Sequence, residues 1–141
     1  MLVQISLQIQ ISTKDCGSDY SSFSNLKINC EEGSTNDVCI LKKFRTYISA
    51  MDLTPNTIIY NGTFDVYQEV EKKSLPFSMK YKTLCAFHDV LCPLKEYATV
   101  VLISEFFVPW FAMSGSSVIK TVLKTYSGQH IFCMKFAADV Q

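Results

Sequence analysis

The chain has 141 residues, of which 48% are hydrophobic and 18% are charged, and thirteen basic residues balance thirteen acidic ones. This length suits one domain with its own core, and the apolar content excludes a disordered chain. The balanced and scattered charge argues against a nucleic-acid partner, and the longest apolar run, Val100–Ile103, is far too short to span a membrane.

The first thirteen residues carry a strand pattern. Apolar residues alternate with polar ones at Val3, Ile5, Leu7, Ile9 and Ile11. The segment lacks the basic start and uninterrupted apolar middle of a signal peptide. A truncated signal, a misjoined first exon and a true first strand are three open interpretations. We therefore divide the chain into an N-terminal segment, 1–13, and a domain at 14–141.

The rest of the domain is rich in strand signals and poor in helical periodicity. Strands are predicted at 23–28, 44–51, 57–70, 75–84, 97–108, 117–126 and 130–140. The segment 44–51 also suits a helical turn. At Asn61-Gly62, the stretch 57–70 is either one broken strand or two strands joined by a hairpin. Ser127-Gly128-Gln129 predicts a hairpin between the last two strands. Seven or eight short strands indicate a sandwich or a barrel.

Six cysteines suggest disulfides formed in an oxidising compartment. Six allow 15 connectivities, and spacing favours Cys16–Cys133, Cys30–Cys39 and Cys85–Cys92. Buried free thiols in a cytosolic protein are the alternative. The triplet Asn61-Gly62-Thr63 is a glycosylation sequon, which has meaning only in the secretory pathway. We expect a protein that is secreted or resident in the lysosomal or endosomal lumen, with Asn61 as the glycosylation site.

Four motifs carry a family resemblance that covers residues 15–140. Asp15-Cys16-Gly17-Ser18 resembles the opening of the ML lipid-recognition domain, the family of the Niemann–Pick type C sterol carrier, mite group-two allergens and the ganglioside activator. The stretch from Cys30 through Cys39 to Lys43 resembles a second element, with Phe44 where a glycine is common. Cys85 to Cys92-Pro93-Leu94 and the closing hairpin through Cys133 resemble two more.

The resemblance implies an all-β, immunoglobulin-like sandwich of two antiparallel sheets with a lipid cavity between them. It implies the same three disulfides that spacing favours. The expected function is carriage of a sterol, fatty acid or phospholipid tail, with no cofactor other than the bound lipid. A membrane or membrane receptor would accept the lipid, and the protein is expected to be a monomer. The alternatives are a lipid-dependent co-receptor in innate immune recognition and a pocketless adhesion or allergen-like domain.

Lipid-contacting residues are expected on two lips of the cavity. Alternate residues of a strand face opposite ways, so the aromatic run from Phe106 to Phe111 cannot all be core on one face. The resemblance places this run on one lip and Leu75-Pro76-Phe77 on the other. The predicted pocket residues are Phe64, Val66, Pro76, Phe77, Val108, Trp110 and Phe111. The alternative for each is ordinary core packing, or an exposed patch for a protein or membrane.

Other chemistry has weak support in the sequence. His88 lies between Cys85 and Cys92, but zinc would need a fourth ligand, for which Asp89 is the nearest candidate. We expect no metal, since disulfide pairing consumes both cysteines. Only His88 and His130 could act as bases near neutral pH, and neither adjoins a convincing nucleophile. We therefore expect no catalytic residues and no enzyme activity.

Overall fold

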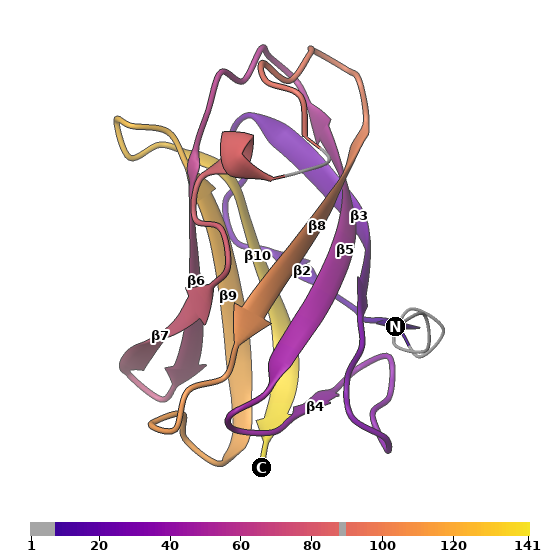
Figure 1. Ribbon diagram of the computed structural model, residues 1–141, viewed down its shortest axis with the longest axis vertical. Helices are drawn as coiled ribbons and strands as arrows, with labels where there is room; N and C mark the ends of the chain where they lie inside the picture. Colours follow the sequence, from indigo (N-terminus) through magenta and orange to yellow (C-terminus); the bar gives the residue numbers. More distant parts are fainter. Residues whose placement is uncertain (1–7, 88–89) are drawn as a thin grey trace.

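Two layers of strands face each other across an apolar interior in the computed structural model, which describes residues 8–87 and 90–141 (Figure 1). The predicted all-β sandwich is confirmed. The strands are β1 (Ile9–Gln10), β2 (Lys14–Asp15), β3 (Ser21–Ile28), β4 (Cys39–Leu41), β5 (Thr46–Pro55), β6 (Thr63–Val70), β7 (Lys73–Met79), β8 (Val100–Phe107), β9 (Gly115–Lys124) and β10 (His130–Val140). One short 3-10 helix, η1 (Leu84–Ala86), precedes β8. No helix in the described residues is long and apolar enough to cross a membrane.

The first sheet contains β1, β3, β5 and β8, and the second contains β6, β7, β9, β10 and β2. Neighbouring strands are antiparallel, except that β4 runs parallel to β10. Strand β7 belongs to both layers, because Ser78 and Met79 at its end pair with Phe107 and Phe106 of β8. One edge of the sandwich is therefore closed by a strand that crosses between the sheets.

A disulfide and backbone hydrogen bonds close the other edge. The Cys16–Cys133 disulfide ties the segment before β3 to the middle of β10, across a sequence separation of 117. The Cys16 N–H donates to the Cys133 carbonyl oxygen (2.9 Å), and the Ser21 hydroxyl donates to the Ile131 carbonyl oxygen (2.9 Å). Together with Cys30–Cys39 and Cys85–Cys92, this confirms the predicted disulfide pairing.

Strand β10 supplies much of the core. Phe132, Met134 and Phe136 alternate along it and line the space between the sheets. Ile131 and Cys133, which point the other way, are also fully buried. The chain before β3 lies alongside that part of β10, with Tyr20 donating its N–H to the Ile131 carbonyl oxygen. Burial on both faces explains why β10 is continuously apolar at 131–134, whereas burial alternates in the rest of the strand.

The strand predicted at 57–70 is confirmed only over β6, and the hairpin interpretation at Asn61-Gly62 is wrong. Ile59 forms an isolated bridge to Leu94, and regular pairing begins only at Thr63. The Asn61 side-chain oxygen accepts the N–H groups of Gly62 (2.9 Å) and Cys85 (3.2 Å). A Cβ at Gly62 would lie 2.9 Å from a Leu123 methyl carbon, so a glycine is needed for close packing rather than for a turn.

Several predicted boundaries shift. The segment 44–51 contains a strand and not a helical turn, but β5 begins at Thr46, after a turn in which Phe44 has a positive φ of 65°. Strand β7 ends at Met79, and Leu84 belongs to η1. Within the N-terminal segment, Ile9 pairs with Ile28 of β3 and Ile11 is buried, so part of this segment packs with the domain. Residues 1–7 lie outside the described part.

Candidate functional site

The main candidate site is a narrow slot between the two sheets. Both sheets and the loop after η1 contribute side chains to it. Its lining consists of Leu26, Ile28, Ser49, Met51, Phe64, Val66, Phe87, Leu102, Ser104, Phe106, Ile119, Thr121, Phe132, Met134 and Phe136. The free space is about 30 Å³, which is about the volume that one water molecule occupies in the liquid. Side chains therefore nearly fill the slot in this conformation.

Aromatic rings make up much of the wall. Phe64 stacks on Phe87 with ring centroids 5.1 Å apart, and it meets Phe132 edge-on at 5.9 Å. Lower in the sandwich, Phe77 stacks on Phe106 at 6.5 Å. Such offset aromatic pairs add roughly 0.5–1.5 kcal/mol each beyond their area burial. Phe87 comes from the loop after η1 rather than from a strand, and its N–H donates to the Leu84 carbonyl oxygen (3.2 Å).

The polar groups in the slot are hydroxyls. Ser49 on β5 and Ser104 on β8 are cross-strand partners, and their Oγ atoms lie 2.6 Å apart. Thr121 on β9 contributes a third hydroxyl-bearing side chain. None of the lining residues carries a charge at neutral pH. Burying an unpaired charge in such surroundings is costly, so the slot suits apolar groups and neutral polar groups.

The predicted pocket residues occupy three different environments. Phe64 and Val66 line the slot. Phe77 and Val108 are buried without lining it, and Phe77 supports the slot through its stack on Phe106. The remaining three, Pro76, Trp110 and Phe111, are exposed. Lipid contact by any of the seven stays a prediction.

Most of the wall residues were not among those predicted from the sequence. Phe132, Met134 and Phe136 form an alternating stripe in the last strand that could have been found from the sequence. Ser49 and Ser104 carry no such signal, because a serine in a strand is equally compatible with an outward position. Phe87 was hidden in the loop between two cysteines, where spacing alone predicts no burial.

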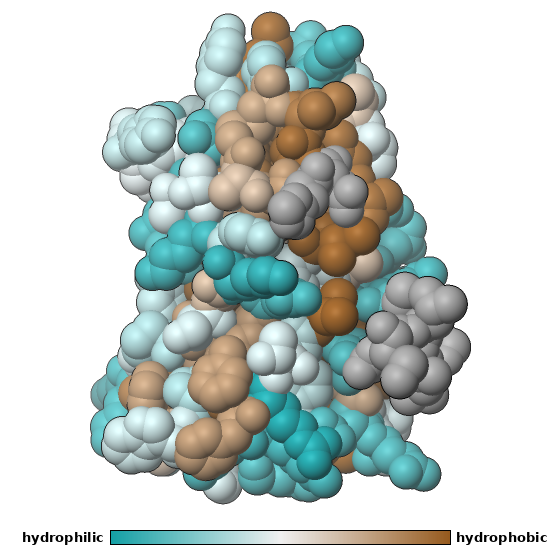
Figure 2. All heavy atoms as spheres, viewed as in Figure 1, coloured by the Kyte–Doolittle hydropathy of each residue, from teal (hydrophilic) through white to brown (hydrophobic). Residues whose placement is uncertain are grey.

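Apolar groups also reach the surface of the sandwich. On the face shown in Figure 2, apolar residues gather over the upper half, where β8 runs, and exposed members of β8 are Val101 and Ile103. At the top of the molecule, an open groove of about 500 Å³ lies between the segment 57–61 and the β9–β10 hairpin. Tyr60 and Tyr126 on its rim are largely exposed. The groove lies outside the sandwich interior, so it would hold a ligand only at the surface.

Tyr47, a buried tyrosine of β5, links two loops at the lower end of the sandwich through its hydroxyl group. The Tyr47 hydroxyl donates to Glu31 Oε2 (2.6 Å) and accepts the Lys42 N–H (2.6 Å), while Arg45 pairs with Glu31 Oε1 (2.9 Å). Burial, followed by the hydrogen bond to Glu31, raises the pKa of Tyr47 well above its ordinary value. Tyr47 is therefore a structural donor and stays neutral over the physiological range.

The structure describes the predicted glycosylation site and part of the segment considered for zinc binding. Asn61 is half-buried, and its amide nitrogen makes no hydrogen bond to the described part of the chain. Cys85 and Cys92 are joined to each other, which removes both thiols as zinc ligands. His88 and Asp89 lie outside the described residues. Elsewhere in the described chain, no group of three potential metal ligands comes together.

Comparison with known proteins gives a consistent family. The ML-domain family model matches residues 10–140. A Niemann-Pick type C2 protein from the Japanese carpenter ant has a similar structure, with a TM-score of 0.78 and 25% identity, over 93% of this chain and 100% of that one.

Chicken MD-1, solved in complex with lipid IVa, has a TM-score of 0.50 and 13% identity, over 91% of this chain and 96% of that one. That likeness bears on the fold alone. No curated protein sequence matches the chain. With a family model matched across almost its whole length and three disulfides in one sandwich, the chain belongs to the ML-domain family.

Proposed function

We propose that this protein carries a lipid in the slot between its two sheets, in a secreted or lysosomal setting, and that it is not an enzyme. The observation that carries the proposal is the slot itself, whose walls from both sheets are apolar apart from three hydroxyl-bearing side chains. A lipid tail there replaces side-chain contacts with ligand contacts and gains roughly 25 cal/mol per Å² of apolar surface removed from water. Membership of the ML-domain family supports the same function.

A ligand must enlarge the slot before it can enter. Sites for small molecules enclose roughly 300–1,000 Å³, which is ten times the free space here or more. One edge is held by the β7–β8 pairing and the other by Cys16–Cys133, so neither edge separates easily. The upper part of β8 lacks pairing to β7, and Phe87 packs into the slot from the adjoining loop. We infer that the sheets separate at this part of the β8 edge and that the Phe87 side chain moves out of the slot as they do.

The charge pattern restricts how a lipid would lie. The slot lining is uncharged, so a phosphate or carboxylate headgroup would stay at the surface while its tail enters. A neutral hydroxyl could enter, because the Ser49–Ser104 pair holds two hydroxyl protons and uses only one between its oxygens. A sterol or a neutral single-tail lipid is therefore the preferred cargo.

The direct test is lipid extraction from protein secreted by cultured cells. Mass spectrometry should find a lipid enriched at near one molecule per protein. The purified protein should also take up a fluorescent sterol or fatty acid. Absence of both an enriched lipid and uptake would contradict the proposal.

A substitution inside the slot sharpens the test. Ser104→Leu adds volume to a nearly filled space, so lipid uptake should fall about tenfold or more while the fold is retained. Ile103→Leu is the matched control, since Ile103 is exposed on the same strand. Equal uptake by the two variants, both folded by circular dichroism, would place the lipid outside the slot.

A further inference from the structure

The open groove at the top of the sandwich, which we call the upper groove, offers both apolar and hydrogen-bonding contacts. It measures about 500 Å³ and lies between the segment 57–61 and the β9–β10 hairpin. Three isoleucines and three tyrosines make up its apolar lining: Ile58, Ile59, Ile131, Tyr20, Tyr60 and Tyr126. Its other side chains are all neutral and polar: Thr57, Asn61, Thr125, Ser127 and Gln129.

Two of the tyrosines in the upper groove bury little of their rings. Tyr60 on the segment 57–61 is 73% exposed, and Tyr126 on the hairpin is 90% exposed. Tyr20 differs, because it is half-buried and its hydroxyl donates to Gln129 Oε1 (2.8 Å). Exposed rings on the two sides of an uncharged groove suit a ligand with both apolar faces and hydroxyl groups. Sugars have this character.

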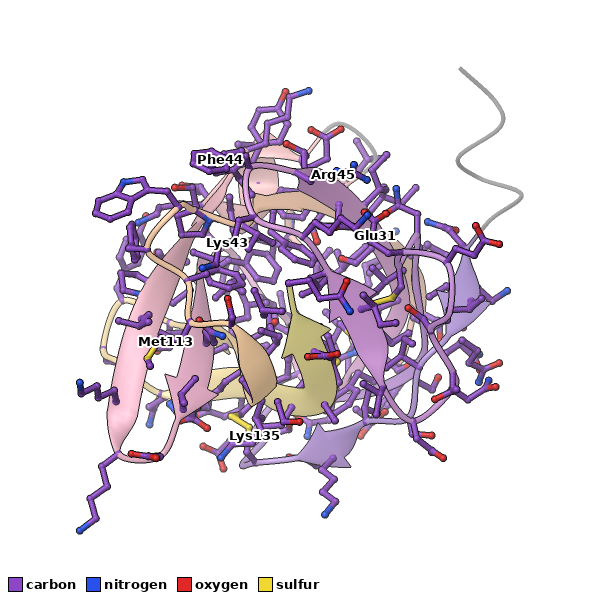
Figure 3. All side chains as sticks on the ribbon, turned by 90° about the horizontal axis from the view of Figure 1, so that it is seen from below. Glu31, Lys43, Phe44, Arg45, Met113 and Lys135 are labelled. Carbon is purple, nitrogen blue, oxygen red and sulfur yellow. A yellow bond between two sulfur atoms is a disulfide. The ribbon has the colours of Figure 1, made fainter. Side chains whose placement is uncertain are left out.

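The lack of charge separates the upper groove from the opposite end of the molecule. Figure 3 looks onto that end and shows Glu31, Lys43 and Arg45 there. Glu31 and Arg45 form an ion pair (2.9 Å). None of the residues that line the upper groove carries a charge at neutral pH. The groove therefore has no group that would attract a phosphate or a carboxylate, and it favours a neutral ligand.

Asn61 belongs both to the lining of the upper groove and to the sequon. Its side-chain oxygen accepts the N–H groups of Gly62 (2.9 Å) and Cys85 (3.2 Å), which fixes the plane of the amide. The amide nitrogen, to which an N-linked glycan is attached, makes no hydrogen bond to the described part of the chain. Attachment leaves the oxygen free to accept, so both hydrogen bonds of Asn61 survive modification.

The direction of the amide places a glycan beside the upper groove. In Figure 1 the segment 57–61 passes between η1 and the β9–β10 hairpin. Cys85 of η1 holds the oxygen of Asn61 on one side of this segment, and the upper groove lies on the other side. The oxygen and the nitrogen of an amide point away from each other, so the nitrogen is directed away from Cys85. The first sugar therefore begins at the wall of the groove.

We propose that the upper groove holds the protein's own N-linked glycan, with the first N-acetylglucosamine units between Tyr60 and Tyr126. The C–H groups on the sugar faces pack on the tyrosine rings, while the acetamido and hydroxyl groups bond to the polar side chains of the groove. Covalent attachment gives the sugars a high effective concentration, so weak contacts are sufficient. The inference takes its secreted or lysosomal setting from the proposed function, and it does not depend on lipid carriage.

NMR of the glycan tests this position directly. In protein from mammalian culture, the acetamido methyl protons of the first sugar should resonate upfield of their position in the denatured chain, because a tyrosine ring shields nuclei above its face. Replacing Tyr60 and Tyr126 together by alanine should abolish the shift. Tyr97→Ala is the matched control and should keep it, since Tyr97 is 72% exposed and does not line the groove. An unshifted methyl signal in the natural chain would overturn the proposal.

Denaturant unfolding measures the contacts. Thr63→Ala removes the glycan and leaves Asn61 in place. The factor by which it raises the unfolding equilibrium constant should be about fivefold larger in the natural chain than in the chain lacking Tyr60 and Tyr126. Any contribution of Thr63 itself is common to both backgrounds and cancels. In the Tyr97→Ala background, the factor should equal that of the natural chain.

The outcomes separate the glycan from the cargo. Mass spectrometry of the natural chain shows whether Asn61 carries a glycan, and an unmodified Asn61 would refute the proposal. Equal factors in the natural chain and in the chain lacking Tyr60 and Tyr126 would refute it as well. A protein that yields an enriched lipid while its glycan signal stays unshifted refutes the glycan contact alone. One whose glycan signal is shifted but that carries no lipid refutes the carrier function alone.

Discussion

The fully buried side-chain amide of Gln68 pairs with the backbone of Met113 as a neighbouring strand would. Gln68 Oε1 accepts the Met113 N–H (2.9 Å), and its Nε2 donates to the Met113 carbonyl oxygen (2.7 Å). Nε2 also donates to the Ser117 hydroxyl (3.1 Å). One strand residue thus satisfies a loop backbone that has left the sheet, and it fixes the loop that presents Trp110.

Removing this amide should release the loop. Gln68→Met keeps the side-chain length but leaves the Met113 N–H and carbonyl without these partners, at a cost of about 2–3 kcal/mol. Gln68→Glu retains an acceptor for the N–H and loses the donor to the carbonyl. Hydrogen exchange at the Met113 amide should accelerate strongly in the first variant. Unchanged exchange there would show that the loop is held by other contacts.

Tyr47→Phe should destabilise the protein by about 1–2 kcal/mol, since it removes the hydroxyl that joins Glu31 to the Lys42 backbone. The difference should depend on pH. Burial raises the pKa of Tyr47 in the folded state, so its contribution is complete below about pH 10 and declines as the unfolded phenol ionises above that value. Chemical denaturation of both proteins across this range should show the gap narrowing. A gap that stays constant or widens would contradict the assignment.

The sequon can be tested without disturbing Asn61. In protein from mammalian culture, Thr63→Ala should abolish a glycan and Thr63→Ser should keep it, because either hydroxyl completes the sequon. Thr63 is exposed, so neither change should alter the fold. Glycosidase treatment should reduce the mass of the natural chain and the Ser variant only. If glycosidase treatment leaves the mass of each of the three proteins unchanged, Asn61 is unmodified.

The three disulfides should differ in their contribution to stability. Loop-closure entropy predicts about 5 kcal/mol for Cys16–Cys133, with a separation of 117, and about 2.5 kcal/mol for each of the two short loops. Paired replacement by serine, followed by denaturant unfolding, should therefore cost most for Cys16 with Cys133. Thiol titration of the native secreted protein should find no free thiol. Six titratable thiols would contradict the framework.

The features that the sequence alone determined are local ones, such as strands, and covalent ones, such as disulfides. Alternation identified β3 and β6, because a half-buried strand needs apolar residues on one face. Cysteine spacing favoured the observed pairing, because short loops close at low entropic cost. Once the two short loops are closed, Cys16 and Cys133 remain to pair with each other. Resemblance in four motifs then identified the sandwich and the family.

Only the tertiary structure decided where the chemistry lies. Trp110 and Phe132 are both large aromatic residues, yet Phe132 is buried and Trp110 is exposed. The reason is that β8 ends before Trp110, and the loop that follows β8 turns away from the core. Ser49 and Ser104 meet only through the register of β5 with β8, which joins residues 55 positions apart. Phe44 is strained only because the chain must turn between β4 and β5. The exposure of Trp110, the contact between Ser49 and Ser104 and the strain at Phe44 depend on long-range pairing or on backbone conformation, so the local sequence does not predict them.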